Sequence, residues 1–399
     1  MTSLGARIKT LRKKKKLTLQ GLSGDYMTKG MLSLIENDKA KPSMQSLHYI
    51  ADQLDVSVNE LLEQVSVTEV RELLITIETL IKDGENEEII EKMSPLKTEQ
   101  LPISYESAKV LEIYGKSLYA VGEQGWEVTL HQADHLYITL TLFKESVQVT
   151  LFEAWSKIEL QQYEEALHLI REKRSVIQSK GAELETLTSL KYLTFETILL
   201  FAIGHNEEAL HVLHRAIAHS RKSKTFYQVE ELYRLACYYS IMTRDEGAVT
   251  FYLDKLDLYS KFVDSNETKA LVLLLQAHYY NEVKGDYKEA VRSTETFKLL
   301  SGGEVDSYYA MEKGKALYHM GDIKGAWQLL NQFNIIPEWV HPFDRSLIYH
   351  VKAYQARCLM ELGEWEKGKV YAKDAYEGIR GLPETPYQQF VYETFKQSQ

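Results

Sequence analysis

A dense group of basic side chains lies near the start of this 399-residue chain. Residues 1–16 contain no acidic side chain and seven basic ones: Arg7, Lys9, Arg12, Lys13, Lys14, Lys15 and Lys16. A cluster of this kind attracts a polyanion such as DNA. The alternative is a solvated helix end, because cations near a helix C-terminus also interact favourably with the helix dipole.

The first 64 residues carry a net positive charge and the rest of the chain a net negative one. They hold 10 Lys and Arg against 7 Asp and Glu, a net charge of +3. The whole chain has a net charge of −10, so the other 335 residues sum to −13. This asymmetry favours a nucleic-acid-binding head joined to an acidic body.

Five short helices are predicted to position these basic side chains. The hydroxyls of Thr18 and Thr28 can cap the second and third helices, and Gly24 fits the turn between them. Pro42 fits a loop before the fourth helix. By their spacing, the core positions are predicted to be Ile8, Leu11, Leu19, Leu22, Met31, Leu32, Ile35, Leu47, Ile50, Ala51, Leu54, Val58, Leu61 and Leu62.

Residues 35–43, IENDKAKPS, resemble the Ile-Glu-x-Gly/Asp-x-x-x-Pro-Ser signature of the Xre/Cro-type helix-turn-helix family. Residues 55–62, DVSVNELL, resemble the last helix of that family, and the whole resemblance covers residues 4–63. It implies that the helix from about Thr28 to Asn37 enters the major groove of duplex DNA. The implied base-proximal residues are Thr28, Lys29, Gly30 and Ser33, and the implied phosphate contacts are Lys39, Lys41 and Arg12. One such domain makes few base contacts, so a dimer on two half-sites is expected.

The rest of the chain carries a repeat of about 40 residues. Its polar turns are anchored at Gly84, Gly122, Gln161, Gly204, Thr243, Gly285, Gly321 and Gly363. A small residue follows by five at Ala166, Ala209, Ala248, Ala290 and Ala326, and another precedes by seven at Gly115, Ala154, Ala236, Gly314 and Ala356. Small residues at these positions let two helices approach closely, so each unit is predicted to be a helix, a turn and a second helix.

These units resemble tetratricopeptide repeats with lengthened linkers. The predicted fold is therefore all-α: an N-terminal five-helix helix-turn-helix domain (1–64), a linker and hinge (65–72), and a right-handed tetratricopeptide-repeat superhelix for peptide binding and oligomerisation (73–399). In such arrays the first helices line a concave groove that holds an extended peptide.

Counting from the anchors places aromatic and cationic side chains along the expected groove. The peptide-binding candidates are Lys116, Trp155, Lys191, Tyr233, Arg234, Tyr279, Asn281, Lys315, Tyr318 and Arg357. These types suit the backbone carbonyls, side chains and C-terminal carboxylate of a short peptide. The alternative is that they are ordinary solvated or packing positions of an acidic solenoid.

A basic helix-turn-helix head followed by such an array resembles the RRNPP group of Gram-positive quorum-sensing receptors. Array length favours its NprR-like branch. The resemblance implies a transcriptional regulator in which a short signalling peptide binds the groove and changes oligomeric arrangement and DNA binding. The homo-oligomer would be a dimer or larger. The alternative is a Rap-like interaction adaptor that sequesters a response regulator, with or without DNA binding.

The sequence lacks the motifs of common enzyme classes, such as a phosphate-binding Gly-x-x-x-x-Gly-Lys loop, a Gly-x-Ser-x-Gly elbow and His-Glu-x-x-His. His131, Asp134 and His135 form the nearest metal-like cluster, without a convergent third ligand. We therefore expect neither an enzyme nor a cofactor or metal. Cys237 and Cys358 are too few for a disulfide framework, and apolar runs are too short for a membrane span, so the predicted location is cytoplasmic.

Overall fold

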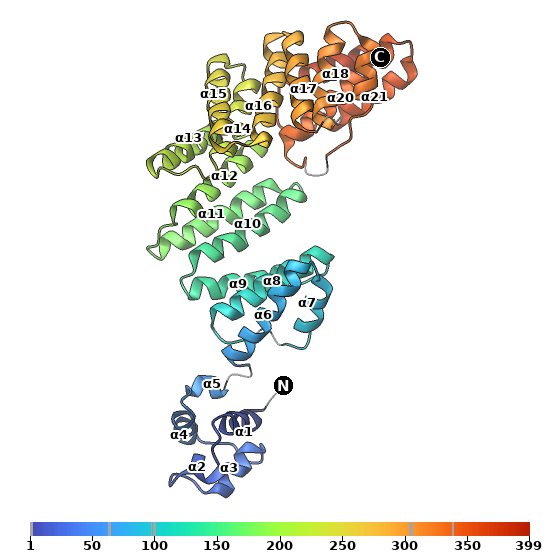
Figure 1. Ribbon diagram of the computed structural model, residues 1–399. Helices are drawn as coiled ribbons and strands as arrows, with labels where there is room; N and C mark the ends of the chain where they lie inside the picture. The colour runs from blue at the N-terminus through green and yellow to red at the C-terminus, as the bar shows by residue number, and fades with distance from the viewer. Residues whose placement is uncertain (1–2, 63–64, 97, 99–100, 303–305, 337–338) are drawn as a thin grey trace. The chain divides into compact units, whose positions relative to one another are not determined.

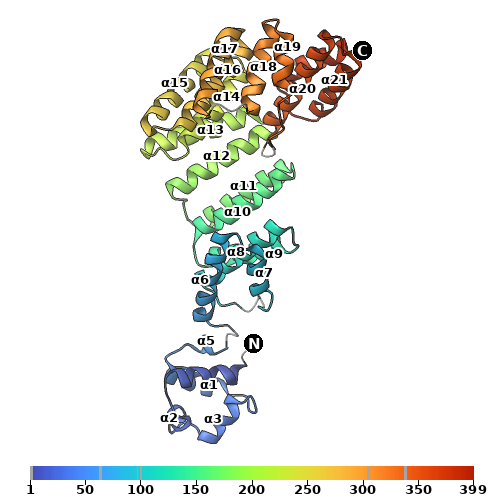
Figure 2. The same ribbon diagram turned by 45° about the vertical axis from the view of Figure 1, so that its right-hand side comes forward.

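The computed structural model describes residues 3–62, 65–96, 98, 101–302, 306–336 and 339–399. All regular elements among these residues are helices (Figure 1, Figure 2). The all-α prediction is therefore confirmed. The helices form two compact units, unit 1 (residues 1–150) and unit 2 (residues 151–399).

The head of unit 1 contains the five predicted helices. They are α1 (Leu4–Lys14), α2 (Leu19–Ser23), α3 (Lys29–Glu36), α4 (Met44–Leu54) and α5 (Val58–Leu62). The Thr18 and Thr28 hydroxyls accept hydrogen bonds from the backbone N–H groups of Gly21 and Met31, as expected of N-caps. The helices enclose a core of their own, in which Ile8, Leu22, Leu32, Ile50 and Leu61 are completely buried.

The turn between α2 and α3 depends on Gly24. Its φ is +52°, and a Cβ atom at this position would lie 2.2 Å from the hydroxyl oxygen of Tyr49. Tyr49 stacks on Tyr26 at a centroid distance of 4.5 Å, so it has little room to move.

We expect Gly24→Ala to destabilise the head by about 1–3 kcal/mol, because the new methyl group meets both an unfavourable φ and the Tyr49 ring. Hydrogen exchange of the α2 and α4 amides in the full chain measures this loss. Gly30→Ala is the control, since its Cβ would meet no atom closer than 3.9 Å. Equal exchange in the two variants would contradict the prediction.

The remaining helices of unit 1 begin earlier than the sequence predicts. They are α6 (Val67–Asp83), α7 (Asn86–Met93), α8 (Tyr105–Val121), α9 (Trp126–Thr139) and the start of α10 (Phe143–Glu159). Ser66 and Glu69 form a capping box at the start of α6. Most of the expected 65–72 linker is thus helical, and residues 63–64 lie outside the described residues.

Unit 2 continues α10 with a series of helix pairs. Its further elements are α11 (Tyr163–Ser179), α12 (Thr186–Ala202), α13 (Asn206–Lys222), α14 (Val229–Met242), α15 (Glu246–Val263), α16 (Asn266–Tyr279), the π-helical turn η2 (Tyr280–Lys284), α17 (Tyr287–Leu300), α18 (Ser307–His319), α19 (Ile323–Leu330), α20 (Pro342–Glu361), α21 (Trp365–Ile379) and α22 (Tyr387–Gln397). Within this unit α12 packs on α13, α14 on α15, α16 on α17, α18 on α19 and α20 on α21. These are the predicted repeat pairs, and α22 packs on the last of them.

The predicted repeat turns are present at every anchor. A residue with positive φ lies at Gly84, Gly122, Gln161, Gly204, Arg244, Gly285, Gly321 and Gly363. Apart from Ala248, the predicted small residues are buried at the helix contacts, and a Cβ on Gly314 would lie 2.6 Å from Leu330. One anchor needs correction: the turn residue is Arg244 rather than Thr243, and accordingly Val249 is fully buried where Ala248 was expected.

A second correction concerns α16. The turn η2 winds more loosely than an α-helix and inserts one residue before the Gly285 anchor. The small buried residue of this helix is therefore Ala277, one place earlier than the spacing predicts. Residues on α16 are shifted by one position relative to the other first helices.

Candidate functional site

The outward face of α3 begins at its first turn. Thr28, Lys29 and Gly30 are exposed and Ser33 is half-buried, whereas Leu32 and Ile35 face the core. Met31 is 48% exposed, which corrects its predicted place in the core. The reason is helical geometry: Leu32 and Ile35 lie three residues apart on one face, and Met31 precedes that face by one position.

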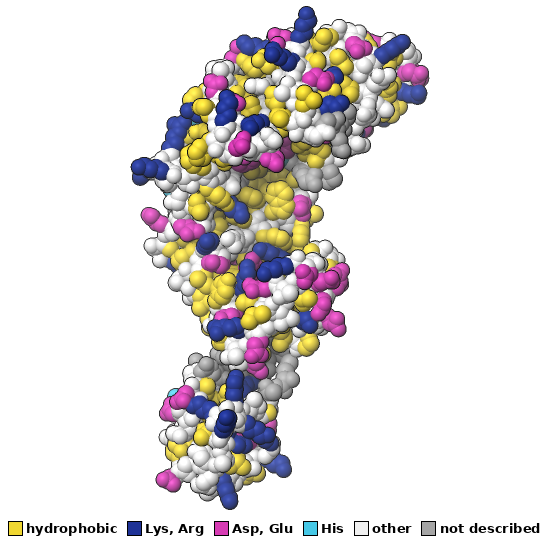
Figure 3. Space-filling view, in the orientation of Figure 1, with side chains coloured by type: hydrophobic (Ala, Val, Ile, Leu, Met, Phe, Trp, Pro, Cys, Tyr) yellow, Lys and Arg dark blue, Asp and Glu magenta, His cyan; other side chains and the backbone are white. Residues whose placement is uncertain are grey.

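Exposed lysines surround this helix. Lys29 lies on it, and Lys39 and Lys41 lie in the following loop. The ammonium groups of these three, and those of Lys13, Lys14 and Lys16, form no hydrogen bond or ion pair with any residue that the structure describes. Lys15 instead pairs with Asp55. Figure 3 shows Lys and Arg side chains gathered on the visible face of the head. Unpaired ammonium groups of this kind are suited to phosphate contacts.

Arg12 has a different position from the one predicted. Its Nε and Nη2 atoms donate to the Glu36 carboxylate over 2.5 and 2.8 Å, and Nη1 donates to the Leu17 carbonyl over 2.9 Å. The side chain is buried, and its hydrogen bond to Glu36 raises the pKa of the guanidinium. The predicted phosphate contact is therefore corrected: Arg12 ties α1 to α3.

The ten predicted groove residues do not form one surface. Lys116, in unit 1, pairs with Glu112 over 2.6 Å. In unit 2, Trp155 is exposed and donates to Glu159 over 2.9 Å, and Lys191 is also exposed. Neither Trp155 nor Lys191 lines the cavity of unit 2 described below.

Several of the other candidates are packing residues. Tyr279 is buried in a cluster with Leu275, and Tyr233 contacts Tyr252 at its margin. Tyr318 donates to Glu361 over 2.7 Å. Arg357 donates to Thr394 over 2.7 Å and stacks over Phe390. For Tyr279 in particular the predicted exposure is wrong, because the extra residue of η2 turns it into the core.

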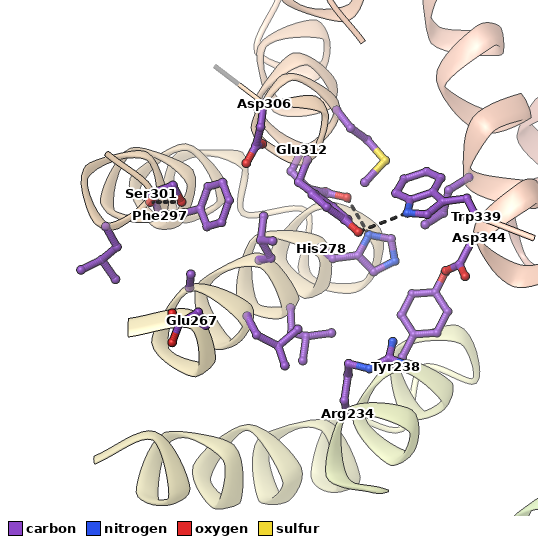
Figure 4. A pocket seen from close by; sticks show the side chains of 18 of the residues that line it. Arg234, Tyr238, Glu267, His278, Phe297, Ser301, Asp306, Glu312, Trp339 and Asp344 are labelled. Atoms are coloured by element: carbon purple, nitrogen blue, oxygen red, sulfur yellow. Dashed lines mark hydrogen bonds and ion pairs between the residues drawn. The ribbon is translucent and has the colours of Figure 1, made fainter. Parts of the chain in front are cut away.

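Unit 2 contains a cavity of about 780 Å³ between its helix pairs. Its walls come from the first helices α14, α16, α18 and α20, from the end of α17, and from Trp339 (Figure 4). The volume is within the range of small-ligand sites. Of the ten predicted residues, only Arg234 lines it.

One part of the cavity wall is apolar and another is charged. The apolar part includes Leu271, Leu274, Phe297, Leu300 and Met311. The charged and polar part contains Arg234, Tyr238, Glu267, His278, Asp306, Tyr308, Glu312 and Asp344. Figure 4 shows Arg234, Tyr238, Asp344 and Trp339 together at one side. A ligand with both an apolar surface and polar groups fits such walls.

A buried ionic network lies behind the wall at His278 and Glu312. Lys315, which is completely buried, places its Nζ 2.8 Å from both Glu282 and Glu312. His278 lies 2.9 Å from Glu312 through Nδ1 and 2.8 Å from the Tyr387 hydroxyl through Nε2. Asn281 donates to Glu312 over 2.8 Å. The predicted groove positions Lys315 and Asn281 therefore support the wall without facing the cavity.

The pKa values of several groups in and beside this network are strongly shifted. Burial opposes the charge of Glu282, but the Lys315 ammonium group and the nearby histidines outweigh it and hold the pKa of Glu282 at about 2. The same balance holds the pKa of Glu312 below its ordinary range. Burial lowers the pKa of His350, on α20, to about 3. At neutral pH both carboxylates are therefore ionised and His350 is uncharged.

No family model matches the chain, and no curated protein matches it. Among solved structures, it is similar to Bacillus thuringiensis PlcR in complex with the peptide PapR7 and DNA, with 17% identity, a TM-score of 0.35, and coverage of 68% of this chain and 99% of that chain. It is also similar to a tetratricopeptide repeat protein from Parabacteroides merdae (11%, TM-score 0.43, coverage 82% and 98%) and to apo ComR from Streptococcus vestibularis (16%, TM-score 0.23, coverage 82% and 98%). All three TM-scores are below 0.5. The chemistry of the site is therefore inferred from its own geometry alone.

Two of the cavity residues, Tyr238 and His278, were missed because of the two register corrections. Six residues before the corrected anchor Arg244 lies Tyr238, and the extra residue of η2 makes His278 the equivalent position on α16. Lys315 is the same position on α18. Tyr238 stacks on His278 at 5.6 Å, and His278 lies 3.4 Å from Lys315, as neighbours in register should. Trp339 and Asp344 do not lie at this position of a repeat, so counting from the anchors could not identify them.

Two further predictions from the sequence concern metal binding and membrane-spanning helices. Among the described residues, no three His, Cys, Asp or Glu side chains converge in a way that could hold a metal ion. Asp134 accepts from Ser146 over 2.5 Å, and His131 and His135 line a smaller cavity of unit 1. Within the part of the chain that the structure describes, no helix has both the length and the apolar composition that a bilayer span needs.

Proposed function

We propose that this chain is a DNA-binding transcriptional regulator of the RRNPP type whose activity is set by a short signalling peptide. The observation that carries the proposal is the outward face of α3, where an exposed first turn adjoins lysines that lack partners among the described residues. In helix-turn-helix docking, the N-terminal part of the second helix of the motif meets base edges, and flanking cations hold phosphates.

Different residues of α3 and of the loop that follows it would contact the base edges and the phosphates. Thr28, Lys29 and Ser33 offer hydrogen-bonding groups to base edges in the major groove. The exposed side chains of Met31 and Leu34 can contact the methyl group of thymine. Lys39 and Lys41 hold the backbone phosphates. A homodimer would place two such helices on two half-sites.

The peptide part of the proposal rests on the cavity of unit 2. It opens among first helices of successive repeats, so a peptide bound there contacts several repeats at once. Such a ligand favours whichever arrangement of the repeats it binds better, and can thereby change the oligomer and its DNA binding. The NprR-like assignment is part of this proposal.

We expect the double variant Lys39→Ala, Lys41→Ala to weaken binding to duplex DNA and to lower the slope of log K against log salt by about 2. The reason is that each lost phosphate contact releases about one counterion fewer. Fluorescence anisotropy at several salt concentrations measures both quantities. Lys288→Ala is the control, since this exposed lysine lies in unit 2 and forms no interaction with a described residue.

A full-length chain that ignores duplex DNA even at low salt would contradict the DNA-binding proposal and support the adaptor alternative. The peptide part is tested by light scattering with and without pools of short synthetic peptides. A change of molar mass on peptide binding is expected. Unchanged mass and no binding across a broad pool would contradict it.

A further inference from the structure

One corner of the cavity in unit 2 contains an acidic group without a protein partner. Asp344 lines the cavity, and its carboxylate forms no hydrogen bond or ion pair with any described residue. Arg234 lines the same cavity, but its guanidinium is held by both oxygens of Glu231 over 2.8 and 2.6 Å. His341 adds no charge at neutral pH, because burial lowers its pKa. The corner therefore has one negative charge in excess.

The other carboxylates of the cavity already have partners. Glu312 is held by His278 and Lys315, and Asp306 accepts the backbone N–H of Tyr309 over 2.7 Å as the cap of α18. Glu267 accepts from the Ser265 hydroxyl over 2.7 Å and is exposed at the rim. Among the described lining residues, Asp344 is thus the carboxylate without a hydrogen-bond or ion-pair partner.

Aromatic rings surround this carboxylate. Tyr238 and Trp339 lie next to Asp344 in Figure 4. Tyr308 is 5.4 Å from Trp339, whose indole N–H donates to its hydroxyl over 3.1 Å. Burial and then the charge of Asp344 raise the pKa of Tyr238, and Asp344 also contributes to the raised pKa of Tyr308. Aromatic faces beside a carboxylate form a favourable site for an ammonium or guanidinium group.

Burial raises the pKa of Asp344 itself, and the neighbouring His341 and Arg234 only partly offset this. The ionised form of Asp344 is therefore less favourable among these protein groups than in water. A ligand cation at this position would restore the lost solvation. An anionic group would instead add a second uncompensated charge.

We propose that the corner formed by Tyr238, Tyr308, Trp339 and Asp344 receives a cationic group of the bound peptide, either its α-ammonium group or a Lys or Arg side chain. This inference rests on the proposed peptide-receptor function and specifies the ligand. It replaces the expectation that cations of the groove bind a C-terminal carboxylate, because Lys315 and Arg357 are engaged within the protein. The apolar wall near Leu271 and Leu274 then takes apolar side chains of the same peptide.

The test uses the full chain and four pools of short synthetic peptides with a body randomised over uncharged residues. The first pool has a free α-ammonium group and a C-terminal amide. The second is N-acetylated and contains one Lys, and the third replaces that Lys by norleucine and is neutral. The fourth is the neutral pool with a free C-terminal carboxylate. Peptides that remain bound through size-exclusion chromatography are counted by mass spectrometry.

We expect at least one cationic pool to be retained about tenfold more than the neutral pool, and the carboxylate pool to show no gain over it. The first two pools distinguish an α-ammonium group from a side-chain cation. Asp344→Asn should abolish the preference and keep the retention of neutral peptides. Glu267→Gln, at the rim, should keep the preference.

The outcomes separate this inference from the function on which it rests. Equal retention of cationic and neutral pools, or a preference for the carboxylate pool, overturns the inference and leaves a peptide receptor. Retention of no pool overturns both. The comparison of pools on the unaltered chain decides the question even if Asp344→Asn fails to fold, and an Asp344→Asn variant that folds and keeps the preference also overturns the inference.

Discussion

Lys315→Met should lower the unfolding free energy of unit 2 by about 3–5 kcal/mol, the usual cost of breaking a buried ion pair from one side. Methionine keeps most of the volume and the apolar stem of the lysine. It removes the ammonium group that lies 2.8 Å from both Glu282 and Glu312. The carboxylates of Glu312, which is buried, and Glu282, which is partly buried, then lose the ammonium group that compensates their charge. The loss is large against the ~5–15 kcal/mol that stabilises a typical folded protein.

The same network makes unit 2 sensitive to acid. The pKa of Glu282 is about 2 in the folded protein against 4.5 ordinarily, so its contribution is complete above about pH 4.5 and is lost as the pH falls towards 2. The pKa of His350 falls from 6.5 to about 3, so the unfolded chain takes up a proton first and stability begins to fall below about pH 6.5. In Lys315→Met the part of this loss below pH 4.5 should shrink.

Urea denaturation of the full chain, followed by hydrogen exchange in α18, measures this prediction across pH. Lys324→Met, at an exposed position of α19, is the control and should change stability by less than about 0.5 kcal/mol. Adding Glu312→Gln to Lys315→Met should recover part of the loss, because one of the two uncompensated charges disappears. A Lys315→Met variant as stable as the control would contradict the ionic role of Lys315.

The fold could be predicted from sequence because it depends on local signals. The head follows from helical spacing and from two threonine caps, and the repeats follow from turns at which a residue adopts positive φ. A turn signal is insensitive to an error of one residue, which is why the Thr243 anchor still located the turn at Arg244. The helical conformation of residues 67–72 was not predicted, and it begins at the capping box of Ser66 and Glu69.

The cavity could not be predicted in the same way, because side-chain direction changes by about 100° for each residue along a helix. A single inserted residue in η2 exchanges the places of Tyr279, which is buried, and His278, which faces the cavity. Lys315 was placed at the right position of its helix, yet its environment depends on Glu282, 33 residues earlier. Pairings over such separations leave no mark in local spacing.

Arg12, in the head, is another residue whose partner could not be predicted from local spacing. A basic residue within a basic cluster was predicted to contact phosphate, whereas its guanidinium is bidentate on Glu36 and also binds the Leu17 carbonyl. Arg12→Ala should therefore destabilise the head by about 3–5 kcal/mol, because Glu36 would remain buried without its partner. Domains of about 60 residues have little stability to spare, so DNA binding should be lost for every sequence.

Arg12→Ala should lose DNA binding because the head unfolds, whereas removal of a phosphate contact weakens binding and leaves the head folded. In Arg12→Ala, amide exchange in α1 and α3 should rise sharply while exchange in α18 stays unchanged, and Arg12→Lys should not rescue the head because an ammonium group cannot match both carboxylate oxygens. Lys13→Ala, at the adjacent exposed position, should keep normal exchange. If Arg12→Ala kept normal exchange and lowered only the salt slope, as Lys41→Ala should, then Arg12 would contact phosphate after all, and the ion pair with Glu36 would have to open when DNA binds.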